Sequence, residues 1–188
     1  MKRTTFANWP CGIARTTDLM GDWWTPLIVR EAMYGSTKFD EFERALRLSR
    51  NILTQRLNRL VEAGIFEKSA YQQRPVRHEY RLTEQGWDLT NVLLVEFAWG
   101  NRWLAPLGAP VTLVDRDSGE PIDPVVVDRT TGRPIDARSI GAAVGPGFPS
   151  KLRNHPVVVE RFGRADDSDA RHRQRHQNQN QHIIGESQ

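Results

Sequence analysis

A run of polar side chains between residues 49 and 58 has the types and the spacing that could bind the edges of nucleic acid bases. An arginine can pair with guanine through two donors, and an asparagine or glutamine can pair with adenine through one donor and one acceptor. No acidic residue falls between Arg47 and Arg59, so this run does not repel a polyanion. The candidate base-contacting residues are Ser49, Arg50, Asn51, Thr54, Gln55 and Asn58.

A helix over residues 49–64 would place these polar groups along one side. The opposite side would carry an apolar stripe with helical spacing, and this stripe consists of Leu53, Leu57, Leu60 and Val61. Ser49 is a suitable N-cap, and Gly64 is suited to the end of the helix. The spacing therefore predicts one face that packs and one face that is open to a partner.

A shorter helix and a tight turn precede this element. The short helix carries the apolar residues Phe39, Phe42 and Leu46. Asp40 is its predicted N-cap, and "RLS" at residues 47–49 forms the turn. A short helix, a three-residue turn and a longer polar-faced helix make the helix-turn-helix pattern. Two further helices are expected upstream, over residues 13–20 and in "TPLIVREAMYG", where Thr25 is the predicted N-cap and Gly35 the predicted end.

Beyond residue 64 the period of the sequence changes to two, which predicts a β hairpin over residues 65–82. From residue 38 to residue 81 there are ten basic and six acidic residues, an excess larger than the net charge of +3 of the whole chain. Basic side chains around a base-contacting helix suit DNA phosphates, which position a protein without specifying sequence. The candidate phosphate-contacting residues are Lys38, Arg47, Lys68, Arg74 and Arg77.

A long helix is predicted after Thr83, and it is apolar on almost all sides between Val92 and Trp99. A domain of about 100 residues has too little interior to bury such a helix fully. We therefore expect it to pack against the same helix of a second chain. The candidate dimer contacts are Leu93, Phe97, Trp99 and Trp103.

Four segments between Cys11 and Leu104 carry a family resemblance: "CGIARTTDLMGDWWTPLIVREAMYGSTKFDEFERAL", "SRNILTQRLNRLVEAGIFEK", "RPVRHEYRLTEQG" and "AWGNRW". In this order and spacing they resemble the HxlR-type winged helix-turn-helix transcriptional regulators. The resemblance implies a dimeric DNA-binding regulator. It also implies that the helix from Ser49 lies in the major groove and that the hairpin, the wing, lies on the backbone or in the minor groove. The first and last helices would form the dimer.

The rest of the chain contains a repeat and a polar tail. Residues 113–124 and 126–137 align as "LVDRDSGEPIDP" and "VVDRTTGRPIDA", each predicting a strand, a turn and a strand start. The tract "RHRQRHQNQNQH" lacks periodicity, which favours disorder. We predict a mainly α-helical fold with a β wing, a small β-rich extension and a disordered tail. The corresponding ranges are a winged helix-turn-helix DNA-binding and dimerisation domain at 1–104, the extension at 105–150 and the tail at 151–188.

The sequence offers little for catalysis or metal binding. Three of the five histidines lie in the tract "RHRQRHQNQNQH", and no glycine-rich nucleotide loop is present. We expect no catalytic residue, metal or cofactor, and therefore no enzyme. The longest apolar run, "VLLV" at 92–95, is far shorter than the roughly 20 residues of a membrane span, and the first ten residues lack a signal-peptide core. We expect a cytoplasmic protein without a membrane partner.

Cys11 is the single cysteine, and two interpretations of it stay open. It is either an incidental or buried residue, or a sensor of oxidants or electrophiles. The second interpretation rests on its position at the start of a helix with Arg15 one turn along, since both features favour the thiolate. Some HxlR-type regulators sense oxidants or quinones through a cysteine near this position, whereas others have the cysteine without that role.

These patterns together predict a homodimeric regulator, a repressor, that binds a pseudo-palindromic operator in double-stranded DNA. A small-molecule effector is a further expected partner. The alternative is a winged-helix module that uses the same hairpin and helix to bind protein. Binding to DNA that weakens steeply with salt would distinguish the two, because phosphate contacts release counterions.

Overall fold

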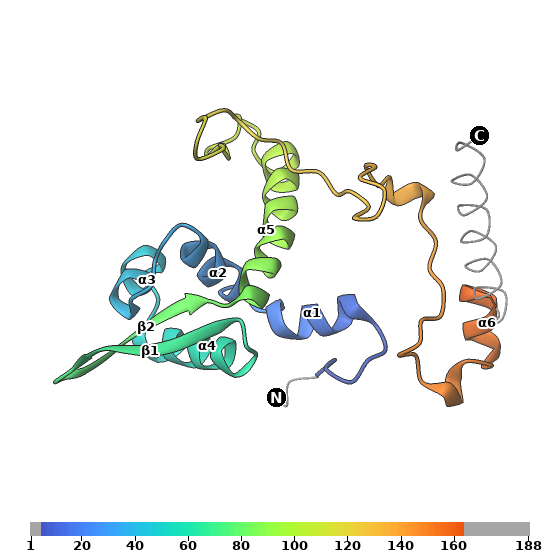
Figure 1. Cartoon of the computed structure of the whole chain (residues 1–188), viewed down its shortest axis with the longest axis horizontal. Coiled ribbons are helices and arrows are strands. Elements are labelled where there is room, and N and C mark those ends of the chain that lie inside the picture. Colours follow the sequence, from blue (N-terminus) through green and yellow to red (C-terminus); the bar gives the residue numbers. More distant parts are fainter. Residues whose placement is uncertain (1–4, 164–188) are drawn as a thin grey trace, which may run out of the picture. The chain divides into compact units, whose positions relative to one another are not determined.

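The computed structural model describes residues 5–163 and contains helices followed by a single hairpin and one long helix (Figure 1). Its elements are α1 (Gly12–Met20), α2 (Thr25–Met33), α3 (Phe39–Leu46), α4 (Arg50–Glu62), β1 (Phe66–Gln73), β2 (Val76–Leu82), α5 (Glu84–Trp103), the 3-10 turns η1 (Ala137–Ser139) and η2 (Ser150–Leu152), and α6 (Pro156–Phe162). The contacts divide the chain into two units. Among the described residues, one unit contains residues 5–7 and Ile13–Pro134, and the other contains Asn8–Gly12 and residues 135–163.

Asp22 caps α2 from the loop before it. Its Oδ1 accepts hydrogen bonds from the backbone N–H groups of Trp24 and Thr25, both at 3.0 Å, and its Oδ2 accepts one from the Thr25 hydroxyl at 2.7 Å. The prediction of Thr25 as the N-cap is wrong, because Thr25 is the first residue of the helix. A carboxylate three residues earlier can accept from both N–H groups, whereas the hydroxyl acts here as a donor.

The start of α3 also differs from the prediction. Asp40 lies inside the helix, and the N-cap is Lys38. The Glu41 carboxylate closes this end by accepting hydrogen bonds from the backbone N–H groups of Lys38 at 2.9 Å and Thr37 at 2.8 Å. These two bonds hold the pKa of the Glu41 carboxyl below its ordinary value. Asp40 is thereby left on the surface of the first turn.

The predicted cap at Ser49 is confirmed, and the helix predicted after Thr83 begins with a cap of the same kind. The Ser49 hydroxyl accepts from the N–H of Ile52 at the start of α4, at 3.4 Å. The Thr83 hydroxyl accepts from the N–H of Gly86 at the start of α5, at 3.0 Å. Between α3 and α4 the chain turns through Arg47, which has a φ of 52° in the left-handed region that non-glycine residues rarely adopt. This turn fixes the angle between the two helices.

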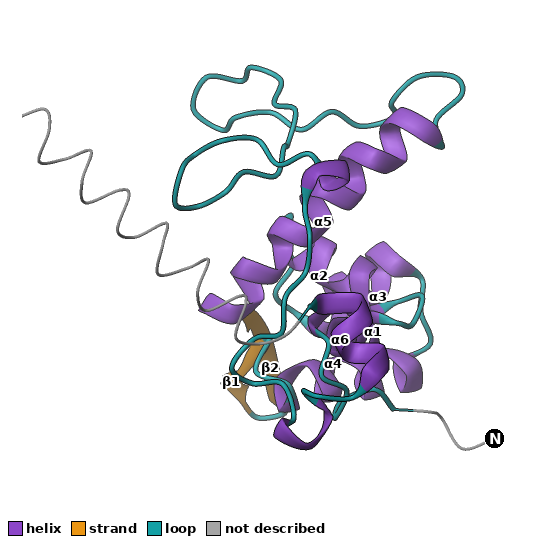
Figure 2. Cartoon of the chain, turned by 90° about the vertical axis from the view of Figure 1, so that its right-hand side faces the viewer, coloured by secondary structure: helices purple, strands orange, loops and turns teal. Residues whose placement is uncertain are grey.

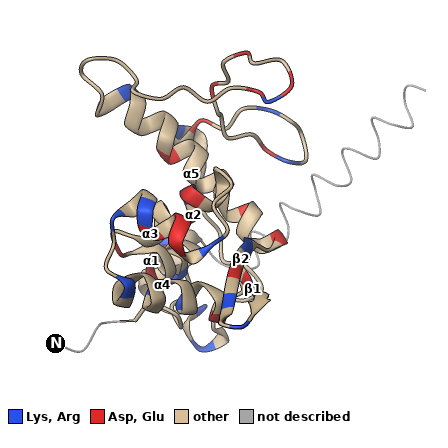
Figure 3. Cartoon of the chain, turned by 90° about the vertical axis from the view of Figure 1, so that its left-hand side faces the viewer, with Lys and Arg blue, Asp and Glu red and all other residues tan. Residues whose placement is uncertain are grey.

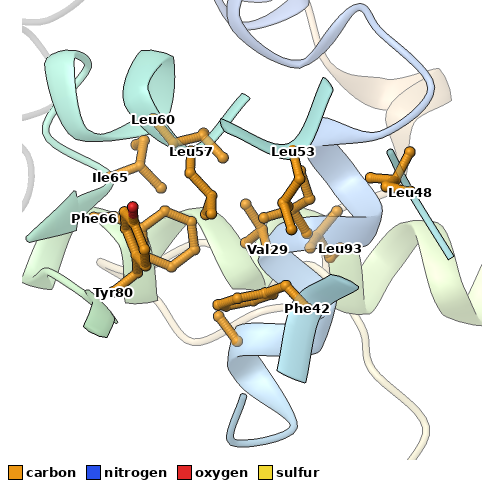
Figure 4. Packing of buried hydrophobic residues seen from close by; sticks show 12 residues of the cluster. Val29, Phe42, Leu48, Leu53, Leu57, Leu60, Ile65, Phe66, Tyr80 and Leu93 are labelled. Carbon is orange, nitrogen blue, oxygen red and sulfur yellow. The ribbon is translucent and has the colours of Figure 1, made fainter. Parts of the chain in front are cut away.

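One hydrophobic core joins the helices to the hairpin. Figure 4 shows its side chains pointing toward one another from α2, α3, α4, β1, β2 and α5. The rings of Phe42 and Phe66 meet edge to face with centroids 6.2 Å apart. The buried hydrophobic residues are Ile28, Val29, Ala32, Phe42, Leu48, Leu53, Leu57, Leu60, Ile65, Phe66, Tyr80 and Leu93. The predicted apolar stripe of α4 is therefore its packed face.

The hairpin is an antiparallel pair whose register runs from Phe66 opposite Leu82 to Gln73 opposite Val76. The register shifts by a bulge beside Tyr71. The carbonyl of Thr37 accepts from the N–H of Tyr80 at 2.7 Å, so the segment before α3 pairs with the edge of β2. Because β1 also contacts α4, the hairpin and the two helices of the helix-turn-helix are held together.

Both copies of the repeat fold in the same way. In the first, the N–H of Asp115 donates to the carbonyl of Glu120 and the N–H of Gly119 donates to the carbonyl of Asp115. Asp128, Arg133 and Gly132 make the equivalent bonds in the second copy. Each copy has a single isolated β bridge, and the surrounding chain is loop (Figure 2). The predicted β character of the extension is thus limited to two short turns.

The predicted disordered range differs in part from what the structure shows. Residues 156–162 form α6, where Pro156 suits the first helical turn and three valines follow. The low-complexity tract from residue 171 on lies outside the described residues. The sequence predicts a domain boundary at residue 105. The contacts instead group the chain up to Pro134, including most of the repeat, with the helix-turn-helix.

Candidate nucleic-acid interface

The exposed face of α4 and its N-cap, Ser49, hold the six candidate base-contacting residues. Ser49, Arg50, Asn51, Thr54, Gln55 and Asn58 are all exposed. The Gln55 amide donates to the Asn51 side chain at 3.4 Å, and the Thr54 hydroxyl donates to the carbonyl of Arg50 at 2.7 Å. These contacts run along the helix surface and leave the amide groups of Asn51 and Gln55 accessible to a partner.

Arg50, at the start of this face, already has partners within the chain. Its Nη1 lies 2.7 Å from Glu43 Oε2 and 3.6 Å from Asp40 Oδ1. Its guanidinium carbon lies 4.7 Å from the centroid of the Phe39 ring. Arg50 is thus held against α3 although it is exposed. The spacing of residues within α4 could not indicate this contact.

Two other arginines of α4 face the opposite way. Arg56 Nη1 lies 3.4 Å from Asp22 Oδ2, and Arg59 donates to the backbone carbonyl of Asp18. Arg59 Nη2 also lies 3.9 Å from the Asp18 carboxylate. These two cations therefore join α4 to α1 and to the loop after it. They contribute to the basic stretch 47–59 in the sequence without lying on the candidate interface.

Asp22 makes the most buried of these ion pairs. Burial raises the pKa of its carboxyl, but the hydrogen bonds from Thr25 and Trp24 and the charge of Arg56 outweigh it, and the pKa is below its ordinary value of 3.8. A carboxyl with a lowered pKa stabilises the folded protein above the unfolded-state pKa. This contribution is lost as the pH falls through the folded-state pKa.

We expect Asp22→Asn to lower the free energy of unfolding by about 1–3 kcal/mol at pH 7, because it removes a charged acceptor from the cap and from Arg56. The difference from the wild type should begin to shrink as the pH falls below about 4, the ordinary pKa of an aspartate, because the unfolded wild-type chain then binds a proton, and it should vanish once the folded carboxyl is protonated too. Urea unfolding across pH 3 to 7 measures this, with Asp88→Asn on the exposed surface of α5 as the matched control. A difference that does not change with pH would contradict the assigned role of the charge.

The five candidate phosphate-contacting residues are all exposed, and they come from several elements. They are Lys38, Arg47, Lys68, Arg74 and Arg77. The Lys38 ammonium lies 5.2 Å from the Tyr71 ring centroid. The Lys68 ammonium lies 5.7 Å from the Tyr80 ring centroid. Basic and acidic segments are interspersed over α3 and the hairpin (Figure 3), so the interface is not uniformly positive.

The predicted dimer contacts on α5 divide into two groups. Leu93 is buried in the chain's own core, and Phe97 is half-buried beside α2. Trp99 and Trp103 are exposed over 56% and 68% of their surface. Val92 and Val95 are also exposed on this helix. The apolar surface that remains accessible is therefore centred on Trp99 rather than on Leu93.

Cys11 is exposed and directly precedes α1. Within residues 5–163, no group of three or more histidine, cysteine, aspartate or glutamate side chains is arranged to hold a metal ion. None of the helices in the same part of the chain combines the length and the apolar character that crossing a membrane requires.

The helix-turn-helix, the hairpin that follows it and the exposed polar face of α4 define the class of winged helix-turn-helix DNA-binding proteins. Residues 19–107 match the family model described as HxlR-like helix-turn-helix. The uncharacterized HTH-type transcriptional regulator Rv3095 of Mycobacterium tuberculosis is 41% identical over 141 residues, which cover 74% of this chain and 89% of the relative. The chain belongs to the HxlR-like helix-turn-helix family and is a DNA-binding transcriptional regulator.

Two solved structures extend the similarity beyond the family segment. PA1607, solved as a candidate transcription factor, is 37% identical with a TM-score of 0.68 and covers 76% of this chain and 100% of its own. PA1374 from Pseudomonas aeruginosa is 42% identical with a TM-score of 0.56, and the match covers 76% of this chain and 98% of PA1374. The 141 residues aligned with Rv3095 exceed the whole stretch up to residue 107, so that similarity includes part of the extension.

Proposed function

We propose that this regulator is a homodimeric repressor that binds a pseudo-palindromic operator. The amino-terminal half of α4 enters the major groove, and the hairpin lies along the DNA backbone. The observation that carries this proposal is the exposed polar face of α4, with cationic side chains from the α3–α4 turn and the hairpin beside it. Arginine and amide side chains on such a helix suit base edges, and the surrounding cations suit phosphates.

The exposed apolar residues of α5 support the dimer. Val92, Val95, Trp99 and Trp103 present large apolar groups to solvent on one helix, which is costly unless a partner covers them. In a two-fold symmetric dimer each α4 meets one half-site, and the half-sites lie about one DNA turn or a multiple of it apart. A groove of about 170 Å³ between α2 and α5, lined by Leu27, Met33 and Phe97 among others, is our candidate for the effector site.

The experiment that tests the proposal starts from selection of bound duplexes from random-sequence DNA by the full chain. Affinities for the recovered duplex and for a random duplex are then measured at two salt concentrations. We expect a palindromic consensus and affinity that falls steeply with salt, because each neutralised phosphate contributes about 0.9 to the slope of log K against log salt. Salt-insensitive or absent DNA binding would instead favour the protein-binding module.

Substitutions on α4 and substitutions on the hairpin should affect DNA binding differently. We expect Gln55→Ala or Arg50→Ala to weaken binding to the selected duplex by about 1–3 kcal/mol and to relax the base preference. Arg77→Ala should weaken binding to all sequences alike, because a phosphate contact carries no sequence information. Competition binding with single-base variants of the duplex measures both effects. An equal loss on specific and random DNA for all three variants would contradict the assignment.

The last part of the proposal is that Cys11 senses oxidants or electrophiles. Its exposure supports this, as does the connection of α1 to α4 through Asp18 and Arg59. As the single cysteine it can respond only by an adduct, by sulfenic acid or by a disulfide to another molecule.

We expect a quinone to lower operator affinity of the wild type by about 5- to 150-fold, the usual range of coupling between two sites, and to leave Cys11→Ser unchanged. Operator binding by both proteins with and without the quinone, in the same buffer, measures this. Equal responses of the two proteins would show that the thiol is not the sensor.

A further inference from the structure

Arg50 combines high exposure with three separate contacts, and this combination is unusual for a surface arginine. Its side chain is 67% exposed, yet Nη1 is close to the carboxylates of both Glu43 and Asp40, and the guanidinium lies over the Phe39 ring. All three partners lie on α3, so the first helix of the helix-turn-helix holds a side chain of the second. We call Phe39, Asp40 and Glu43 the arginine cradle.

The cradle contacts only part of the guanidinium. Both carboxylates meet the same nitrogen, Nη1, and the guanidinium carbon lies over the Phe39 ring. A guanidinium has five N–H donors in a fixed plane, so Nη1 can be held while the edge formed by Nη2 and Nε offers two parallel donors. Two parallel donors are what the O6 and N7 atoms of guanine accept.

The carboxylates of Asp40 and Glu43 should lower the affinity for DNA in general, so their presence beside Arg50 calls for a compensating gain. Asp40 and Glu43 lie at the edge of a surface proposed for a polyanion, where their charge weakens binding to every DNA sequence alike. Freezing a free arginine on binding lowers affinity by roughly twofold to tenfold, and a side chain that is already held avoids most of that loss. A gain of this kind appears only where Arg50 meets a base, so it acts on specific binding alone.

We propose that the arginine cradle positions Arg50 for a two-donor contact with guanine, and that Glu43 is a specificity-determining residue that never touches DNA. The inference rests on the proposed operator binding by α4. Asp40 extends the same role, because its Oδ2 lies 3.6 Å from Arg77 Nη1 while its Oδ1 faces Arg50. One carboxylate thereby sets the position of the hairpin cation relative to the α4 cation.

The test compares Glu43→Gln with Glu62→Gln in the full chain. Glu62 is an exposed residue at the last turn of α4 and provides the same loss of charge on the same pair of helices. We expect Glu43→Gln to lower affinity for the selected duplex by about threefold to tenfold while affinity for random duplex stays equal or rises. Glu62→Gln should raise or preserve both. A rise of both affinities in Glu43→Gln would overturn the proposal, since it would show that the carboxylate only competes with DNA for Arg50.

A double-mutant cycle shows whether Glu43 acts through Arg50. In the Arg50→Ala background, Glu43→Gln should no longer lower specific affinity. A loss of the same size in both backgrounds would overturn the proposal. Thermal unfolding of each variant separates an effect on DNA from an effect on folding.

A measurement without DNA distinguishes failure of this inference from failure of the proposed function. Nitrogen-15 relaxation of the arginine Nε–H groups should show Arg50 more restricted than the exposed Arg44 in the free wild type, and equally mobile in Glu43→Gln. If Arg50 is already as mobile as Arg44 in the wild type, the cradle does not hold it and the inference fails, whatever the DNA experiments show. If Arg50 is held but the wild type does not distinguish the selected from the random duplex, the proposed function fails and the positioning role with it.

Discussion

Phe42→Ala is expected to lower the free energy of unfolding by about 3–5 kcal/mol, because it removes a large, fully buried ring and leaves a cavity. Phe42 lies on α3 and meets the Phe66 ring of β1 edge to face, so its loss also weakens the packing of the helix-turn-helix against the hairpin. Since the net stability of a domain is only about 5–15 kcal/mol, a large part of the folded population would be lost at 37 °C.

Chemical denaturation followed by circular dichroism measures this loss. Val76→Ala, at the exposed end of β2, is the control and should change stability by less than about 0.5 kcal/mol. A Phe42→Ala protein with near wild-type stability would contradict this prediction, because it would show that the core does not depend on the packing of Phe42 against Phe66.

Trp99→Glu is expected to dissociate the proposed dimer. A tryptophan at the centre of an interface typically contributes about 2–4 kcal/mol, which raises the dissociation constant by roughly 30- to 1000-fold, and the new charges would also face each other near the two-fold axis. Operator affinity should fall with it, because a monomer contacts a single half-site. Sedimentation at micromolar concentration and binding to one-half-site and two-half-site duplexes measure the two effects.

Trp87→Glu is the matched control, with the same substitution at another exposed tryptophan of the same helix. It should remain dimeric if the interface is centred on Trp99. A wild-type protein that sediments as a monomer at micromolar concentration would contradict the dimer itself. Dissociation by both variants would extend the interface over the first turns of α5.

Features that depend on neighbours in the chain could be predicted from the sequence. Ser49 and Thr83 cap α4 and α5 because an N-cap acts on residues two or three positions later. The apolar stripe of α4 follows from helical period alone. The same local logic failed at Thr25 and Asp40, because another carboxylate nearby in the chain, Asp22 or Glu41, forms the cap in each case.

Features that depend on tertiary contacts could not be predicted. Arg56 and Arg59 belong to the same basic stretch of sequence as Arg50. Only the position of α1 and the loop after it shows that they bind Asp22 and Asp18. The apolar run of α5 indicated burial, but not that Leu93 belongs to the chain's own core while Trp99 stays exposed. The spacing of apolar residues shows which face of a helix is apolar, but it does not show which neighbouring element covers that face.

The two arginine bridges from α4 to the region of α1 impose a thermodynamic relation. If modification at Cys11 displaces α1, then Asp18 and Asp22 carry that displacement to α4, and operator and electrophile become linked ligands of one equilibrium. Linkage is reciprocal, so a reversible electrophile that weakens operator binding by a given factor must itself bind more weakly by that factor when the operator is bound. Regulator molecules resting on their operators would then be the last to respond, and the unbound molecules would be the first to detect the electrophile.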